Sequence, residues 1–300
     1  MYCSRRSGSV WSASVSGEKR RSWIQFSALL IQNANFRGFF SGKIYQGKLK
    51  QVCVPGINCY SCPGAVGACP IGSLQTFLAS RPVKLPYYVL GFLILFGTIL
   101  GRAVCGFLCP FGFIQELIHR IPLPKKKIGA FPGDKALRKL KYGVLLVLVF
   151  FLPLVMDYTP AFCKYLCPAG TLEGGVPLVL LQSGKLNFPV GSLFYTKLAI
   201  LILLIVLSLF LFRPFCKYLC PLGAVYSLFN RVSFYRMRPE PEKCTHCGAC
   251  AAVCPMQVDP SVSPNHAECI RCGKCTAACP AGALHLGFAA KKKKEQFPSA

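Results

Sequence analysis

Acidic side chains are scarce in this chain of 300 residues: ten Asp and Glu stand against 35 Lys and Arg, a formal net charge of +25. A nucleic-acid-binding protein could carry such a charge, but its basic residues would cluster on a soluble module. Here they flank long apolar segments, and 53% of the residues are hydrophobic. This distribution indicates a membrane protein with basic cytoplasmic loops, and no nucleic-acid partner is expected.

Several cofactor signatures are also missing. There is no CxxCH motif, so c-type haem is not indicated. All four histidines lie outside the apolar runs, so a haem held by two histidines within the membrane is not available. No Rossmann fingerprint or P-loop occurs, which leaves NADH and ATP chemistry without support. The sequence therefore indicates no haem, flavin or nucleotide.

Three apolar runs predict transmembrane helices: 87–104, 140–157 and 193–212. Each is about as long as a helix that crosses a hydrocarbon core of roughly 30 Å. Residues 23–40 form a weaker candidate because Asn and Arg interrupt them, and an interfacial amphipathic helix is the alternative. We therefore expect a mainly α protein with a four-helix transmembrane bundle. No ionisable side chain lies centrally in the three strong runs, which argues against a substrate transporter.

Loop charges predict the orientation. Loop 105–139 is rich in Lys and Arg and is expected in the cytoplasm, whereas loop 158–192 carries two lysines and is expected outside. Alternation places loop 41–86 outside as well. The protein is then a multi-pass protein of the cell membrane with both termini cytoplasmic. Arg20 and Arg21 resemble a twin-arginine export signal, but orientation explains them and no convincing cleavage site follows.

The C-terminal part carries the most specific signal. Residues 244–254 and 269–279 each read C-x2-C-x2-C-x3-C followed by proline, which is the pattern of bacterial two-cluster ferredoxins. In that pattern each [4Fe–4S] cluster takes three cysteines from one run and the fourth from the other. The predicted ligand sets are Cys244, Cys247, Cys250 and Cys279 for one cluster, and Cys254, Cys269, Cys272 and Cys275 for the other. Two zinc sites built from CxxC pairs are the alternative.

Cys-Pro units recur around the apolar runs, at 105–110, 163–168 and 216–221, and a fourth unit ends at Cys69-Pro70. On the predicted topology the inner edge of the membrane carries Cys105, Cys109, Cys216 and Cys220, enough for one [4Fe–4S] cluster. The outer edge carries Cys59, Cys62, Cys69, Cys163 and Cys167, of which a subset would hold a second cluster, and Cys53 is a further candidate. Iron is the expected metal throughout, and zinc or a disulfide stays open for the outer group, particularly for Cys53 and Cys59.

The spacing of these units predicts their local structure. In a C-x3-C pair on a helix, residues i and i+4 share one face, so both sulfurs would point at one cluster. The proline that follows would either end the old helix or begin a new one, and the dipole of a new helix favours a thiolate at its start. Each half of the bundle reads helix, outer unit, helix, inner unit, so we expect a parallel internal repeat about the membrane normal. Buried apolar cysteines are the alternative.

The motifs CGFLCPFGFIQEL, CKYLCPAGTLEG and CKYLCPLGAVYSL resemble the membrane 4Fe-4S polyferredoxins of the NapH and NosR type. The resemblance covers residues from about 23 to 285. It implies four membrane helices with CxxxCP motifs followed by a cytoplasmic two-cluster ferredoxin, in proteins thought to oxidise quinol for a partner reductase. A related branch acts in copper handling during oxidase assembly. This chain departs from the simplest family pattern in its four-cysteine outer loop and an extra CxxxCP pair, which implies a third, outward-facing cluster.

The predicted organisation is a cytoplasmic segment 1–22, a membrane domain 23–235, a small α+β ferredoxin domain 236–287 and a basic tail 288–300 that contacts anionic lipid. The predicted function is an electron relay between the ferredoxin clusters, one or two membrane-edge clusters, and the quinone pool or partner redox proteins. Arg102, beside Cys105, would tune the inner cluster, bind a quinone carbonyl or reach lipid headgroups. The alternative is an assembly factor that reduces a metal ion or partner thiols. Whether the chain is an enzyme subunit, such as a quinol dehydrogenase, is left open.

Overall fold

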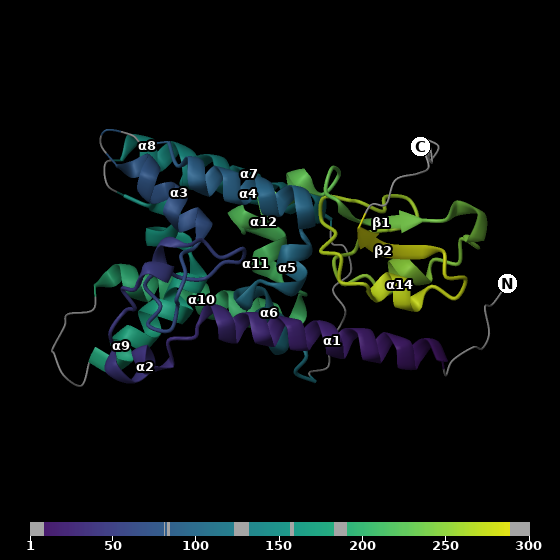
Figure 1. The fold of residues 1–300 in the computed structure, drawn as a ribbon, viewed down its shortest axis with the longest axis horizontal. Helices are drawn as coiled ribbons and strands as arrows, with labels where there is room; N and C mark the ends of the chain where they lie inside the picture. The colour runs from purple at the N-terminus through teal and green to yellow at the C-terminus, as the bar shows by residue number, and fades with distance from the viewer. Residues whose placement is uncertain are drawn as a thin grey trace.

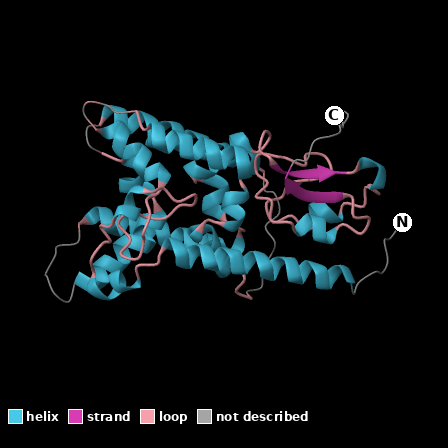
Figure 2. Ribbon diagram, viewed as in Figure 1, coloured by secondary structure: helices cyan, strands magenta, loops and turns pink. Residues whose placement is uncertain are grey.

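The computed structural model describes residues 9–80, 82, 85–122, 132–156, 159–182 and 191–288, with the side chains of 9–16 and 182 left out. Cys3 and all of the predicted basic tail but its first residue lie outside these ranges. Helices make up most of the described chain, and a two-stranded sheet lies at one end (Figures 1 and 2). The prediction of a mainly α protein is confirmed.

The part of the chain before the ferredoxin domain consists of helices and helical turns. In chain order they are α1 (Ser9–Gln32), α2 (Phe36–Ser41), η1 (Lys48–Gln51), α3 (Pro70–Ala79), α4 (Tyr87–Leu100), α5 (Ala103–Phe107), α6 (Pro110–His119), α7 (Asp134–Val144), η2 (Leu145–Phe151), α8 (Leu152–Val155), η3 (Phe162–Leu166), η4 (Gly170–Gly175), α9 (Val176–Gln182), α10 (Ser192–Phe210), α11 (Pro214–Tyr218) and α12 (Pro221–Phe229). Helices α3, α6, α11 and α12 each begin with proline as their first residue, where its missing N–H costs nothing.

The predicted apolar runs become helices with shifted ends. The run 87–104 stops at Leu100 because Gly101 takes a left-handed φ of 54°. The run 140–157 continues from α7 through the π-helical turn η2 into α8, where a proline interrupts the backbone bonding. The run 193–212 is α10.

The weak candidate 23–40 is wrong as a single helix. Helix α1 begins fourteen residues earlier, at Ser9, and ends at Gln32. The Asn35 side-chain amide donates to the carbonyl of Pro63 at 2.8 Å, so the chain turns there before α2 begins. Two asparagines favour such a turn because their side chains compete for backbone partners.

Among the described residues, α10 is the one helix long and apolar enough to cross a membrane, as judged by length and composition. Helix α4 and the segment Gly170–Leu181 are apolar but shorter. The four-helix membrane bundle therefore stays a prediction.

The ferredoxin domain contains β1 (Tyr235–Pro239), η5 (Pro241–Lys243), α13 (Ala249–Ala252), α14 (Lys274–Ala278) and β2 (Leu284–Phe288). The strands pair antiparallel, with Met237 opposite Leu286. Both short helices start after a glycine in the left-handed region, Gly248 at φ 71° and Gly273 at φ 79°. Its side chains Met256, Val258 and Ile270 join the main hydrophobic core, so the domain packs against the helices.

Two buried carboxylates join the elements. Glu116 of α6 pairs with Arg21 of α1 and with Arg213 at the start of α11 (2.6 Å). Glu268 of the ferredoxin domain pairs with Arg102 (2.6 Å) and Lys141. Of these six side chains, Glu268 is 5% exposed and the other five are 2% exposed or less. Arg21, which the sequence assigns to orientation or export, therefore serves the core.

Replacement of Glu116 by Gln tests this junction. Two arginines would lose their buried counter-charge, and breaking a buried ion pair costs about 3–5 kcal/mol. We expect the midpoint of thermal unfolding in detergent to fall sharply, whereas the exposed control Glu242→Gln leaves it within experimental error.

The loss of stability caused by Glu116→Gln should also depend on pH. The paired arginines hold the pKa of Glu116 well below its usual value of 4.5 against the opposing effect of burial. A depressed carboxyl pKa stabilises the fold fully above the ordinary pKa and progressively less as the pH falls below it. The difference between wild type and Glu116→Gln should therefore shrink below about pH 4. A pH-independent difference would contradict the ion-pair account.

Candidate functional site

The ferredoxin cysteines line two separate cavities. One is lined by Cys244, Cys247, Cys250 and Cys279, and the other by Cys254, Cys269, Cys272 and Cys275. These groupings match the crossed sets predicted from the spacing, because the last cysteine of each run points to the cavity of the other. Backbone N–H groups of Val258 and Ala283 donate to the sulfurs of Cys254 and Cys279 at 3.4 and 3.3 Å. Such donors stabilise thiolates bound to iron.

A third group of thiols lies where α5 and α6 meet α11 and α12. It comprises Cys105, Cys109, Cys216 and Cys220, all at least 94% buried. Burial, and next the neighbouring thiols, raise the pKa of Cys109 and of Cys220 above the ordinary thiol value. Metal binding to these thiols would release their protons. We call these four residues the inner quartet.

The expectation that each C-x3-C pair shares one continuous helical face is wrong. Cys105 lies in α5, but the helix ends at Phe107, and Cys109 is the extended residue that caps α6 at ψ 114°. A residue before proline avoids the helical conformation. The second cysteine of the pair thus faces the first from the start of a new helix, one of the two arrangements that the proline predicts.

Each Cys-Pro unit places an amide at its second sulfur. The N–H of Gly112 donates to Cys109, that of Gly223 to Cys220 and that of Gly170 to Cys167, at 3.4, 3.1 and 3.3 Å. A Cβ on Gly112 would lie only 3.0 Å from the Arg213 guanidinium. Glycine at this position therefore lets a cation approach the thiols.

Two buried arginines each donate a hydrogen bond from one inner Cys-Pro unit to the other. Arg102, three residues before Cys105, donates to the carbonyl of Cys216 at 3.0 Å, and Arg213, three residues before Cys216, donates to the carbonyl of Cys105 at 2.5 Å. These reciprocal contacts are of the kind that a twofold repeat produces. Both side chains are fully buried, so Arg102 does not reach lipid headgroups. Both guanidinium groups bring positive charge close to the inner quartet. We call Arg102 and Arg213 the arginine pair.

A fourth group combines loop 53–69 with the unit at 163–167. The pKa of Cys167 is raised by burial and by its neighbours Cys163, Cys59 and Cys69. A Cβ on Gly170 would lie 3.6 Å from the Cys59 sulfur and 3.7 Å from that of Cys167. Burial raises the pKa of Cys59 and Cys163 to about 12. We call these four cysteines the outer quartet.

The two remaining cysteines of the loop have other neighbours. The sulfur of Cys62 lies 3.7 Å from the side-chain oxygen of Asn33, and that of Cys53 lies 4.0 Å from the hydroxyl of Ser73. Both are buried. Cys59 and Cys69 are thus the loop cysteines that lie beside Cys167, with Cys62 next to Cys59 and Cys53 next to Cys69. Which of the four bind a cluster stays a prediction.

Two glutamines occupy matching places at the two quartets, and the sequence reasoning missed them. Gln115 donates to the sulfur of Cys216 at 3.3 Å, and Gln75 donates to that of Cys163 at 3.4 Å. Each also accepts from the backbone N–H just before that cysteine, at Phe215 and Phe162. The signal was present as the repeated C-P-x-G-x-x-Q at 69–75 and 109–115.

Loop 53–69 also connects the two quartets. Burial raises the pKa of the Cys109 and Cys69 thiols, and the nearby backbones of Ile57 and of the next residue, Asn58, act in the opposite direction. Gly56 permits this approach, since a Cβ there would lie 2.9 Å from the Cα of Cys109. Loop 53–69 therefore contacts the inner quartet as well as contributing to the outer one.

Within the described residues, no three or more His, Cys, Asp or Glu side chains gather closely enough to hold one metal ion. A zinc site requires that arrangement. A cubane cluster distributes its four thiolates over four irons, so its ligands need not converge on one point.

Comparison with known proteins agrees with this chemistry. Residues 85–130, 142–179 and 193–239 match the family described as a 4Fe-4S binding domain, and residues 236–280 match a 4Fe-4S dicluster domain. The chain is 32% identical to protein MJ0750 of Methanocaldococcus jannaschii over 63% of its own length and 74% of the relative. The chain belongs to the 4Fe-4S polyferredoxin family of the NapH and NosR type.

Further relatives have more informative names. The ferredoxin-type protein MauN of methylamine utilization in Paracoccus denitrificans is 30% identical over 61% of this chain, and the regulatory protein NosR of Stutzerimonas stutzeri is 30% identical over 55%. The chain spans 59% of MauN and 22% of NosR. No solved structure matches this polyferredoxin. The cluster-binding domains and the ferredoxin-type relatives indicate that this polyferredoxin functions in iron–sulfur electron transfer.

Proposed function

We propose that this polyferredoxin is a membrane-bound relay with four [4Fe–4S] clusters. Two would be held by the ferredoxin sets, one by the inner quartet and one by the outer quartet. The observation that carries the proposal is the packing of loop 53–69 against both quartets. Cys59 and Cys69 of this loop belong to the outer quartet, and a Cβ on Gly56 would lie 2.9 Å from the Cα of Cys109 in the inner one. A short stretch of backbone therefore connects the two thiol groups.

The chain supplies what such clusters require. Each set has four thiols, and amide donors reach at least one sulfur in every set. The bound clusters would carry single electrons, while the protein sets their potentials through hydrogen bonds and charge. The arginine pair favours added negative charge at the inner quartet. At the outer quartet Pro160 and Gly56 stand at the matching positions, and the cation Lys197 donates to the carbonyl of Cys163 at 3.1 Å.

The four sets lie in order along the molecule. Figure 1 shows the ferredoxin domain with α14 at one end, α5, α6, α11 and α12 in the middle, and α3 and α9 at the other end. The buried pairs of Glu268 hold the ferredoxin domain against the inner quartet. With the basic loops in the cytoplasm, the ferredoxin domain would face the cytoplasm and the outer quartet the far side.

Quinone is the proposed exchange partner, together with a partner redox protein. The alternative, an assembly factor that reduces a metal ion or partner thiols, depended on spare outer cysteines. Cys53 and Cys62 are 4% and 1% exposed, so they do not present thiols to a passing ion. The relay is therefore the better-supported function.

Iron content tests the ligand sets. Purified protein should contain about 16 irons per chain if all four sets hold a cubane. Cys163→Ser should lower this by about four, because one cluster loses a ligand, whereas the matched buried variant Cys62→Ser should leave it unchanged. Equal losses in both variants, or about eight irons in wild type, would contradict the assignment.

Exchange with quinone is tested by EPR. A reduced naphthoquinol analogue added anaerobically to protein in nanodiscs should produce [4Fe–4S] signals, and oxidised quinone should remove them. The Cys163→Ser variant should lose the outer signal alone. If quinol reduces no cluster and quinone oxidises none, quinone is not the partner. A metal-handling role would instead appear as lost metal in a partner enzyme after deletion of the gene.

The arginine pair predicts the potential of the inner cluster. Arg213→Gln removes a buried positive charge beside the cluster, so its midpoint potential should fall by on the order of 50 mV. Redox titration followed by EPR measures this, and the other clusters serve as internal references. Arg20→Gln, an exposed control of the same charge, should shift nothing. An unchanged inner potential in Arg213→Gln would show that the pair is only structural.

A further inference from the structure

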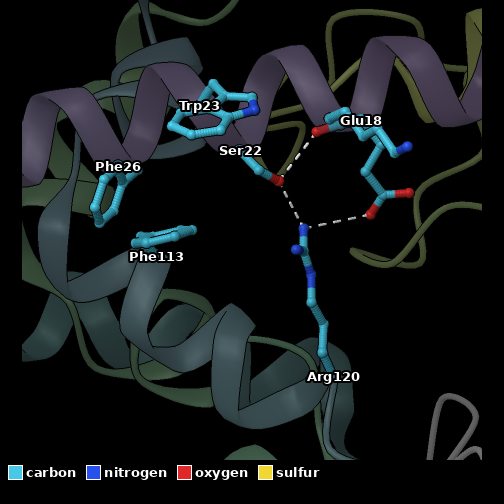
Figure 3. Close-up of a pocket in the computed structure, with 7 residues that line it drawn as sticks. Glu18, Ser22, Trp23, Phe26, Phe113 and Arg120 are labelled. Carbon is cyan, nitrogen blue, oxygen red and sulfur yellow. Dashed lines mark hydrogen bonds and ion pairs between the residues drawn. The ribbon is translucent and has the colours of Figure 1, made fainter.

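A cavity of about 660 Å³ lies between α1 and α6, outside the four thiol groups. Figure 3 shows its two sides: the rings of Trp23, Phe26 and Phe113 face one part, and Arg120 with Ser22 and Glu18 closes the other. Ligand sites typically combine such apolar walls with a few polar groups that fix orientation.

The polar side is held in place. Nη2 of Arg120 donates to the Ser22 hydroxyl at 2.8 Å and lies 3.2 Å from Glu116 and 3.7 Å from Glu18. These contacts all use one nitrogen of a guanidinium that carries five N–H donors. The side chain is 41% exposed, so a ligand oxygen can reach the others.

The cavity adjoins two of the thiol groups. The N–H of Phe113 bonds the carbonyl of Cys109, so this ring stands one helical turn from the inner quartet. Glu18 pairs at 2.9 Å with Lys274, the neighbour of Cys275 in the ferredoxin domain. A ligand here would sit beside both.

An exposed apolar track leads away from the cavity along α1. Trp23, Phe26 and Leu30 are 67%, 40% and 39% exposed, and their spacing places them on one helical face. They lie in the predicted membrane-facing part of α1. A hydrocarbon tail could follow this face while a ring occupies the cavity.

We propose that this cavity binds the head group of a quinone, with a carbonyl oxygen accepting from Arg120, the ring among the aromatic side chains and the isoprenoid tail along α1. The inference rests on the proposed exchange with quinone and specifies its site. An anionic lipid phosphate is the competing ligand, because Lys19 lines the cavity together with Arg120, and the binding test below distinguishes the two. A neutral ring with carbonyls matches both sides of the cavity.

Fluorescence tests binding directly. The chain has two tryptophans, so Trp11→Phe leaves Trp23 as the sole indole. In nanodiscs of neutral lipid, decylubiquinone should quench this fluorescence saturably. Arg120→Gln and Phe113→Leu, made in the same background, should each weaken binding about tenfold. Arg20→Gln, on the same helix but outside the cavity, should bind as the parent does.

Four results would overturn the site: quenching that rises linearly without saturation, equal affinity in parent and cavity variants, loss of affinity in Arg20→Gln, or displacement by added anionic phospholipid. Retained EPR signals show that the variants are folded. If quinone binds saturably yet reoxidises no cluster, the proposed function fails and the site stands. If quinol reduces the clusters equally in parent and cavity variants, the function stands and the site is wrong.

Discussion

The architecture depends on buried ion pairs between four cations and two carboxylates. Glu116 and Glu268 each pair with two basic side chains that belong to different elements. An unpaired charge in such surroundings would cost several kcal/mol, so the elements can be packed only in arrangements that satisfy both. One carboxylate joins α1 and α11 to α6, and the other attaches the ferredoxin domain to the helices. Two of the cations, Arg102 and Arg213, also reach the inner quartet. The same charges that hold the junction together therefore set the electrostatics of the redox centre.

The Cys-Pro unit places a cysteine sulfur at the start of a helix at four points in the chain. Proline ends one helix and begins the next, so the cysteine before it is extended and its sulfur faces the new helix's amides. The glycine three residues after the cysteine donates its N–H to the cysteine sulfur. In two of the four units, the glutamine six residues after the cysteine donates to a cysteine sulfur of the opposite unit. A short motif thus supplies a cysteine ligand, an amide donor to its sulfur and a glutamine that hydrogen-bonds to the opposite unit. Repetition of the motif then yields two similar quartets from a single chain.

Sequence reasoning succeeded where spacing alone constrains geometry. The crossed ferredoxin sets and the helical starts at proline follow from short motifs. The inner quartet follows from the repetition of one Cys-Pro unit, although its two halves lie far apart in the chain. Sequence reasoning failed where a side chain has a remote partner that no motif marks. The helix 23–40 was misplaced because Asn35 bonds Pro63, twenty-eight residues away. Arg21 was interpreted as a surface charge because its counter-ion, Glu116, lies ninety-five residues further on.

The residues themselves determine that this polyferredoxin binds iron through cysteine, because thiolates at these spacings fit a cubane and little else. They also determine the two-domain order, since the ferredoxin runs follow the last apolar segment. Only the tertiary structure decides which loop cysteines lie beside Cys167 and that loop 53–69 packs against both quartets. The reason is physical: a four-cysteine loop can present any pair of its sulfurs, and only packing against Cys163 and Cys109 selects one.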